Sequence, residues 1–266
     1  MAGREPTRRM VLGGLSGLAM AGRVKAMEGK MGWPVLELRQ YKIVKGRRDA
    51  LITLFEREFV EPQEALGMRL FGQFRDLDDA SRFTWLRGFT DMPARAKALT
   101  DFYTGPVWQA HRGAANPLLE DNDNVLLLAA AWDGAGLPPP REPRAPAGSE
   151  PAVAGLVMAH ILYLWRPPGE GFTDWFRAEL MPAFAAAGMA VVGAYVPEAA
   201  PNNFPRLPVR GEDKLFVCFS RVADEGAGRR ALAALVASPA WAAAADWLER
   251  APQVLRLAPT ARSALR

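Results

Sequence analysis

Residues 35–46, VLELRQYKIVKG, carry the side chains of this sequence that are best suited to chemistry. Side chains on a β-strand alternate between its two faces. Glu37, Arg39 and Tyr41 therefore share one face of the predicted strand, and the leucines share the other. A carboxylate, a guanidinium and a phenol at this spacing could orient a polar ligand or transfer a proton. Their chemistry depends on whether this face meets water or the inside of the protein.

Two other predicted strands carry candidate site residues. Trp85 and Arg87 share a face of the segment 82–89. Because buried charges must be paired, Arg87 is the expected partner of Glu37. His160 stands on an otherwise apolar segment in the second half of the chain. A histidine there is suited to accept a proton or to ligate a haem iron, and it fits a hydrogen-bonded structural role as well.

Few other residues suit catalysis. The chain holds one cysteine, Cys218, and two histidines, so an internal disulfide and a cysteine-cluster metal site are excluded. The sequence contains no phosphate-binding glycine loop, no H-E-x-x-H pair and no serine elbow. These absences argue against nucleotide-binding, zinc-protease and hydrolase functions. We predict no metal site, and the sequence identifies no cofactor.

The net charge of +4 comes from the front of the chain. Residues 1–30 hold six Lys and Arg against two Glu, an excess equal to the net charge of the whole chain. The remainder is electrically balanced, and a composition that is 50% hydrophobic and 23% charged is typical of a globular protein. The basic character therefore gives no reason to expect nucleic acid as a partner.

The same front segment resembles an export signal. Residues 7–22, TRRMVLGGLSGLAMAG, have adjacent arginines, an uncharged stretch and an A-x-A-like site ending at Ala21. This order is typical of a secretory signal, and the arginine pair resembles the bacterial twin-arginine route. The uncharged stretch is too short to span a bilayer as a helix. We expect residues 1–32 to be a signal and disordered lead, read by the twin-arginine machinery, on a periplasmic or secreted protein. A basic tail on a cytoplasmic protein is the alternative.

The rest of the chain divides near its middle. Residues 134–153 contain six prolines and cannot form a helix or a central strand, so they are predicted to be an extended linker. On either side, residues 33–133 and 154–260 show the same order of strand, helix, strand, strand, helix, strand, and residues 261–266 remain as a tail. An x-Pro-x-Trp segment in the second helix recurs in both halves. We infer a duplication.

This order predicts an α+β fold made of two ferredoxin-like βαββαβ units. Each unit leaves one face of its sheet uncovered, and a partly apolar face must be buried. The two sheets are therefore expected to face each other and to close into one α+β barrel within the chain. Glu37, Arg39 and Tyr41 would then point into the space between the sheets, with the leucines beneath the helices. A solvated face with weak surface ion pairs is the alternative.

The first repeat resembles the NIPSNAP family. The resemblance rests on LELRQYKIVKGRRDALITLF, on Gly67, on the strand RFTWLRGFTDMPAR that runs into an arginine-containing helix start, and on GPVW. It extends from Pro34 to about Leu128, and the second half looks like a more divergent copy. Aligned on the glycine that closes the first strand, the polar triplet is not repeated, since its three positions are occupied by His160, Leu162 and Leu164.

The resemblance implies a fold more than a reaction. NIPSNAP proteins are similar to the dimeric α+β barrel superfamily, which includes cofactor-independent monooxygenases, isomerases and haem-binding proteins, but they have no settled catalytic activity. The first hypothesis is an exported barrel that binds a small apolar or amphipathic ligand, or a partner protein. A monooxygenase- or isomerase-type enzyme using Glu37, Tyr41 or His160, and a haem protein with His160 as ligand, are the alternatives. Association into a homo-oligomer stays open.

Overall fold

The structure, a computed structural model, describes residues 1, 33–139, 143–150 and 155–266, and the predicted export signal lies outside them. The strands of the first repeat are β1 (Val35–Ile43), β2 (Arg69–Asp76), β3 (Arg82–Phe89), the short β4 (Leu119–Asp121) and β5 (Val125–Ala130). Those of the second repeat are β6 (Leu156–Tyr163), β7 (Val191–Pro197), β8 (Leu215–Val222) and β9 (Gln253–Pro259).

Eight of the described strands close into one antiparallel barrel. Their order is β3-β2-β9-β6-β8-β7-β5-β1, and pairing of β1 with β3 completes the ring, while β4 pairs with the end of β1. Within each repeat the order is that of a ferredoxin-like unit, β2-β3-β1-β5 and β7-β8-β6-β9. The repeats join at their edges, β2 to β9 and β5 to β7. The predicted intrachain α+β barrel of two such units is confirmed.

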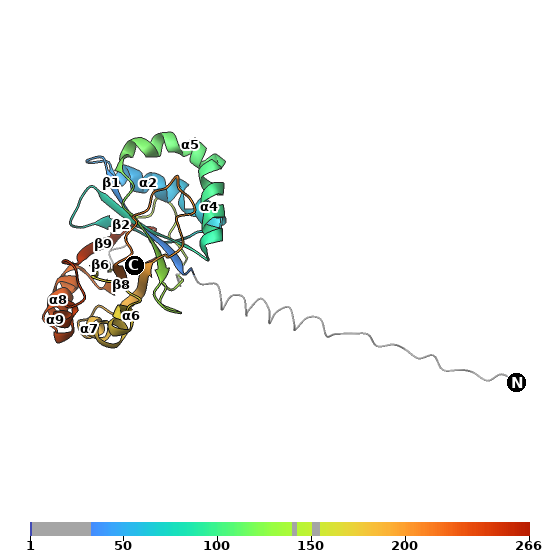
Figure 1. Ribbon diagram of the computed structural model, residues 1–266. Helices are drawn as coiled ribbons and strands as arrows, with labels where there is room; N and C mark the ends of the chain where they lie inside the picture. The colour runs from blue at the N-terminus through green and yellow to red at the C-terminus, as the bar shows by residue number, and fades with distance from the viewer. Residues whose placement is uncertain (2–32, 140–142, 151–154) are drawn as a thin grey trace. The chain divides into compact units, whose positions relative to one another are not determined.

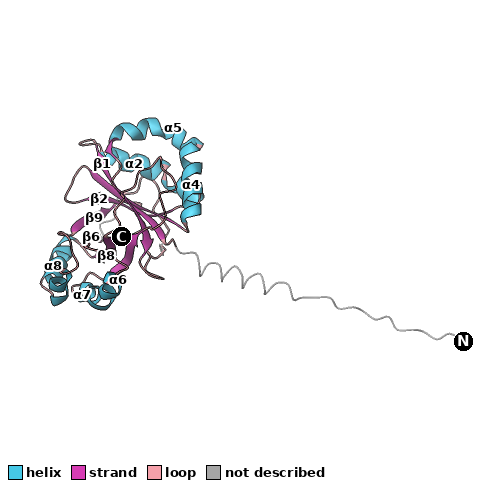
Figure 2. Ribbon diagram, in the orientation of Figure 1, coloured by secondary structure: helices cyan, strands magenta, loops and turns pink. Residues whose placement is uncertain are grey.

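Helices cover the outside of this barrel in two groups. The first group is α2 (Arg48–Glu58), α3 (Val60–Ala65), α4 (Met92–Thr104), α5 (Pro106–Ala115) and the 3-10 turn η1 (Asn116–Leu118). The second group is α6 (Phe172–Trp175), the π-helical turn η2 (Phe176–Leu180), α7 (Met181–Ala186), α8 (Glu225–Val236) and α9 (Pro239–Ala244). Figure 1 shows α2, α4 and α5 on one side of the strands and α6 to α9 on the opposite side, and Figure 2 shows the strands between them.

The same local signals place the helices in both repeats. Asp91 and Asp224 are the N-caps of α4 and α8, and their carboxylates accept from the backbone N–H three residues later, at 2.6 and 2.7 Å. Gly67 and Gly188 follow α3 and α7 with φ of 87° and 82°, a left-handed conformation that glycine adopts without steric cost. These matched signals explain why two halves of different sequence fold alike.

Both faces of the barrel strands are buried, against different partners. The inside is packed by a cluster drawn from all eight barrel strands and from no helix, including Leu36, Leu38, Phe74, Ile161 and Phe219. Outside, each repeat packs its own helices on its own strands, in one cluster around Phe55 and Phe102 and another around Phe176 and Phe216. We call these two outer layers the first-repeat interface and the second-repeat interface.

The C-terminal tail is part of the folded barrel. Leu265 N donates to Phe71 O at 2.6 Å, Thr260 Oγ1 donates to Glu56 Oε1 at 2.5 Å, and Arg262 pairs with Glu61. The described part of the proline-rich linker also lies on the barrel, because Arg144 donates to Glu64 Oε1 at 2.8 Å. The linker between the repeats and the tail after them therefore help to hold β2 and α2 in place.

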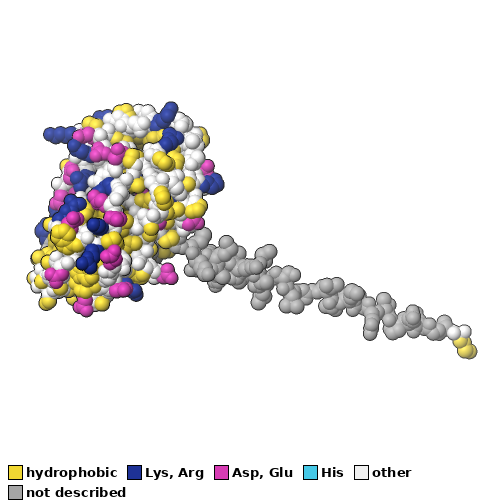
Figure 3. Space-filling model, viewed as in Figure 1, with side chains coloured by type: hydrophobic (Ala, Val, Ile, Leu, Met, Phe, Trp, Pro, Cys, Tyr) yellow, Lys and Arg dark blue, Asp and Glu magenta, His cyan; other side chains and the backbone are white. Residues whose placement is uncertain are grey.

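None of the helices in the described part of the chain is long and apolar enough to cross a bilayer. Figure 3 shows acidic and basic side chains interspersed with hydrophobic ones on the face in view, in keeping with the electrical balance of the chain after its first 30 residues.

Candidate functional site

The six candidate side chains face the helices and not the barrel interior. Five of them lie at the first-repeat interface: Glu37, Arg39, Tyr41, Trp85 and Arg87. The sixth, His160, lies at the second-repeat interface against a phenylalanine of α7. The prediction that these residues line a space between the sheets is therefore wrong. The interior of an eight-stranded barrel can be filled by its own side chains, and here Leu36, Leu38 and their apolar neighbours pack together inside it.

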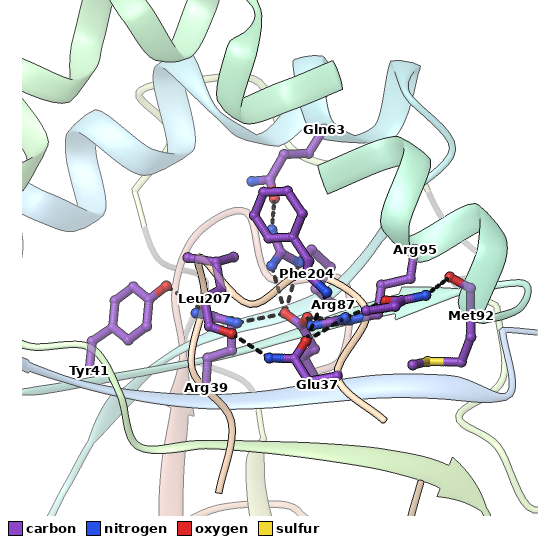
Figure 4. Close-up of polar contacts among 11 residues, drawn as sticks. Glu37, Arg39, Tyr41, Gln63, Arg87, Met92, Arg95, Phe204 and Leu207 are labelled. Atoms are coloured by element: carbon purple, nitrogen blue, oxygen red, sulfur yellow. Dashed lines mark hydrogen bonds and ion pairs between the residues drawn. The ribbon is translucent and has the colours of Figure 1, made fainter. Parts of the chain in front are cut away.

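Glu37 is the centre of a buried charge cluster (Figure 4). Its Oε2 accepts from Arg39 Nη1 at 2.7 Å and from Arg87 Nη2 at 2.6 Å, and its Oε1 accepts from Arg95 Nε at 2.8 Å. All four side chains are 0% exposed. We call these four residues the arginine cluster. The predicted pairing of Arg87 with Glu37 is confirmed, and the two stand directly opposite each other on β3 and β1.

Neighbouring side chains fix the arginines in place. Arg39 Nε donates to Tyr41 Oη at 2.9 Å, and Arg87 Nη1 donates to Gln63 Oε1 at 2.8 Å. The Trp85 ring lies 5.4 and 4.9 Å from the guanidinium carbons of Arg39 and Arg87, within the range of cation–π attraction. Each guanidinium thus has both a polar partner and an aromatic surface, so the cluster is a defined arrangement of donors.

A loop of the second repeat completes the site in the first. Residues 198–213 connect β7 to β8, and their asparagines reach Arg95, whose Nη1 donates to Asn202 Oδ1 at 3.0 Å and to Asn203 Oδ1 at 2.8 Å. Asn203 Nδ2 in turn donates to Met92 O at 2.6 Å, in the first turn of α4. We call this segment the capping loop.

The capping loop also closes the site with apolar side chains. Phe204 stacks on Tyr103 with ring centroids 5.8 Å apart, and Leu207 and Val209 pack against the same core. Figure 4 shows Phe204 and Leu207 on the helix side of the arginines. Arg210 N donates to Val125 O at 2.8 Å and ties the end of the loop to β5. The arginine cluster is therefore enclosed by strands, by α3 and α4, and by this loop.

The charge states in the cluster follow from its contacts. Burial alone would raise the pKa of Glu37, but the adjacent Arg87, Arg39 and Arg95 hold that pKa well below its ordinary range. Burial raises the pKa of Tyr41 to about 12, so the phenol is protonated at neutral pH. Arginines stay charged in proteins. Among the described residues Glu37 is the one carboxylate paired with these arginines, so the cluster carries a net charge of +2.

Some buried donors of the cluster region lack a hydrogen-bond acceptor in the described structure. Arg39 Nη2 and Trp85 Nε1 have no hydrogen-bond partner in the described part of the protein. Their side chains are 0% and 2% exposed, and they occupy directly opposed positions on β1 and β3. A buried donor without an acceptor costs about 1–3 kcal/mol, so this region can still gain stability by accepting a partner with acceptor oxygens.

Among the residues that the structure describes, the second-repeat interface has no such cluster. His160 on β6 is paired in register with Cys218 on β8, as Glu37 on β1 is with Arg87 on β3. Both nitrogens of His160 lack a partner among the described residues, and its ring centroid lies 4.9 Å from that of Phe184. Burial lowers the pKa of His160 to about 4.

A haem iron does not fit at this histidine. His160 is 0% exposed, its ring packs against that of Phe184, and its neighbours on the same face of β6, Met158 and Leu162, belong to an apolar cluster. A haem plane needs open space next to the ligating nitrogen, and a fully buried ring packed against Phe184 does not offer it. Within the described residues no group of three or more His, Cys, Asp or Glu could hold a metal ion.

Sequence reasoning missed several residues of the site. Arg95 follows the N-cap of α4, and the only signal for it was the arginine-containing helix start of the family resemblance. Gln63 lies on the short α3 and is 1% exposed, without any sign of that burial in the sequence. Asn202 and Asn203 lie 107 and 108 residues from Arg95, in a loop that has no counterpart in the first repeat. Such long-range contacts leave no local pattern.

Comparison with known proteins supports the predicted fold, and it supports the predicted family for the first repeat. Residues 36–133 match the model of the NIPSNAP family. None of the curated proteins matches the sequence. A NIPSNAP family protein of Agrobacterium tumefaciens str. C58 shares 23% identity over 35% of this chain and 83% of its own, with a TM-score of 0.33.

Solved structures extend the likeness to the whole barrel. A candidate monooxygenase of Lactobacillus acidophilus NCFM has a TM-score of 0.53 at 10% identity, covering 86% of this chain and 94% of its own. An anthrone oxidase-like protein has a TM-score of 0.52 at 12% identity, covering 87% and 93%. At these identities the likeness concerns the fold alone. The chain is thus an α+β barrel whose first repeat matches the NIPSNAP family.

Proposed function

We propose that this protein binds a small amphipathic ligand at the arginine cluster of its first repeat. The observation that carries the proposal is the difference between the repeats. The same βαββαβ unit is built with four buried charged side chains at one interface and with His160, Cys218 and apolar neighbours at the other.

The fold itself does not need the cluster. Burying charged groups costs several kcal/mol per ion, and apolar side chains of similar volume are often as stable or more so. The second repeat is an example of that solution within the same chain. Groups that are buried at a cost in stability are typical of functional sites, where binding and not folding accounts for them.

The charge states favour binding over proton transfer. Three arginines hold the pKa of Glu37 far too low for it to be an effective proton acceptor at neutral pH. Tyr41, with a pKa of about 12, is protonated and can donate a hydrogen bond. His160, the other base considered from the sequence, belongs to the other helix layer. These residues suit a role in holding a polar group, which supports the ligand-binding hypothesis over the enzyme alternative.

Calorimetric titration with small aromatic probes tests this proposal. Phenol, benzamide and benzoate would be titrated into the wild type and into a charge-free variant carrying Glu37→Leu, Arg39→Met, Arg87→Met and Arg95→Leu. We expect at least one probe to bind the wild type and to lose that binding in the charge-free variant. Circular dichroism provides the control that the variant is folded. Equal binding to both proteins, or no binding of any probe to the wild type, would contradict the proposal.

We further propose that the protein is exported by the twin-arginine route, on the pattern of residues 7–22. Fractionation of a bacterial host tests it. Arg8→Lys with Arg9→Lys should keep the protein in the cytoplasm, whereas the wild type should reach the periplasm, and Arg23→Lys is the matched control. Cytoplasmic retention of the wild type would refute the export proposal without touching the ligand site.

A further inference from the structure

We propose that the ligand of the arginine cluster is a carboxylate with an apolar body, and that the capping-loop asparagines occupy the position of its carboxylate when the site is closed. This inference rests on the proposed function and names the class of ligand. Four observations support it: the net charge of the site, its donors without an acceptor, the asparagine contacts and the apolar side chains around it.

The net positive charge of the site favours an anionic ligand. One carboxylate, Glu37, faces three buried guanidiniums, and the excess of two positive charges lies out of contact with water. A buried charge without a counter-charge is strongly unfavourable. An anionic ligand would lower this cost, whereas a neutral ligand would leave it unchanged and a cation would increase it.

The free donors call for acceptor oxygens. Arg39 uses Nε and Nη1, which leaves Nη2 without an acceptor in the described structure, and the indole N–H of Trp85 is also unused. A guanidinium carries five N–H donors in a planar fork that matches a carboxylate. A carboxylate is an acceptor at both oxygens and can therefore take up donors that the protein leaves free.

The asparagines show how a planar oxygen-bearing group fits here. Arg95 Nη1 donates to the carboxamide oxygens of both Asn202 and Asn203. A carboxamide has the shape of a carboxylate but lacks its charge, so these contacts satisfy geometry without neutralising Arg95. A ligand carboxylate would exchange neutral acceptors for a charged one, and hydrogen bonds between charged groups are about twice as strong as neutral ones.

The walls of the site call for an apolar body on the ligand. Phe204, Leu207 and Val209 of the capping loop pack with Tyr103 over the cluster. Opening of the loop would expose these apolar side chains next to the arginines. A ligand with an aromatic or aliphatic body would bury that surface, whereas inorganic phosphate would not. An amphipathic carboxylate satisfies both requirements.

Paired probes test the inference. Benzoate, its neutral isostere benzamide and inorganic phosphate would be titrated into the full chain by calorimetry at constant ionic strength. Benzoate should bind at least about tenfold more tightly than benzamide or phosphate, since a hydrogen bond to a charged group is worth about that ratio or more. Arg39→Met should weaken the affinity for benzoate about 10- to 100-fold. Arg229→Met on the surface of α8, away from the cluster, is the matched control that should keep the affinity.

Substitutions in the capping loop should have the opposite effect on the affinity for benzoate. Replacing both asparagines, Asn202→Ala with Asn203→Ala, removes the groups that compete for Arg95 and should tighten benzoate about tenfold, since less of the protein is held in the closed form. Asn116→Ala, at an exposed asparagine of η1 outside the site, should leave the affinity unchanged. Weaker binding in the double variant would overturn the role of the asparagines.

The outcomes separate this inference from the proposed function. Benzamide or phenol binding as tightly as benzoate would overturn the carboxylate inference and leave the proposed function standing. Phosphate binding more tightly than benzoate would do the same. Absence of binding for every probe would remove both. A crystal structure with benzoate on Arg39 and Arg95 would confirm the site directly.

Discussion

The two helix–sheet interfaces of this barrel have the same architecture and opposite chemistry. At the first, Glu37 on β1 faces Arg87 on β3 across the strand pair. At the second, His160 on β6 faces Cys218 on β8 in the equivalent register. Each layer has one helix that begins at an aspartate cap, α4 or α8, and another that is followed by a left-handed glycine, α3 or α7. The fold therefore tolerates either a charged or an apolar layer.

The comparison teaches which residues the fold requires. Features that recur in both repeats, such as caps, glycines and the apolar barrel interior, are sufficient to build the unit. Features present in one repeat only, the arginine cluster and the capping loop, are additions. They also meet, because the loop of the second repeat covers the cluster of the first. The arginine cluster and the capping loop are thus two separate departures from the repeat pattern that lie at the same site. We place the function at this site.

The largest expected effect is at Glu37. Glu37→Gln keeps the shape of the side chain but leaves three guanidiniums without a carboxylate. Removing one partner of a buried charge group costs about 3–5 kcal/mol, so the free energy of unfolding should fall by that amount in urea denaturation. His160→Leu, the matched change at the equivalent position of the other repeat, should be neutral or stabilising. A loss below about 1 kcal/mol for Glu37→Gln would contradict the charge distribution described here.

A second prediction concerns acid stability. The pKa of His160 is lowered by burial to about 4, against about 6.5 in the unfolded chain. Between these values the unfolded chain binds a proton that the folded protein does not, so the free energy of unfolding falls as the pH falls. This residue should account for about 3 kcal/mol over the window from pH 6.5 to 4 and for nothing above it.

Urea denaturation at several pH values measures this effect. The difference in unfolding free energy between His160→Leu and the wild type should grow as the pH drops from 6.5 toward 4. His111→Gln is the matched control, because it leaves His160 in place and should keep the acid sensitivity. A constant difference across this window would show that His160 is not buried as described.

The smallest effects should be equal in the two repeats. Asp91→Ala and Asp224→Ala remove the N-caps of α4 and α8, and each should cost about 1 kcal/mol. Only Asp91→Ala should also weaken probe binding, because α4 carries Arg95. Denaturation and calorimetry of the same two variants measure both quantities. If the two variants lost different amounts of stability but bound the probes equally well, the distinction between a shared framework and an added site would be contradicted.

Much of the framework could be predicted from the sequence. Alternation and the positions of proline and glycine predicted the ferredoxin-like order of strands and helices and the linker between the two halves. Each of these signals depends on a few neighbouring residues, so a single sequence is enough to recognise it. The pairing of Arg87 with Glu37 was also predictable, since two buried charges of opposite sign on adjacent strands favour each other.

The direction of the polar face could not be predicted. Alternation shows that Glu37, Arg39 and Tyr41 share a face, but both faces of a closed barrel strand are buried, so hydrophobicity does not tell which one is inside. The apolar face, with Leu36 and Leu38, packs in the interior with the apolar side chains of the other strands, and the charged face meets the helices, where its partners lie. The partners come from α3, α4 and the capping loop, which only the folded chain brings together.

The most direct test of the account is the stability of the charge-free variant, Glu37→Leu, Arg39→Met, Arg87→Met and Arg95→Leu, compared with Glu37→Gln. If the arginine cluster serves binding and not folding, the fourfold variant should fold and lie within about 1–2 kcal/mol of the wild type or above it. Glu37→Gln alone should lose about 3–5 kcal/mol. A fourfold variant that is destabilised as much as Glu37→Gln would show that the fold depends on these charges, which would contradict the account.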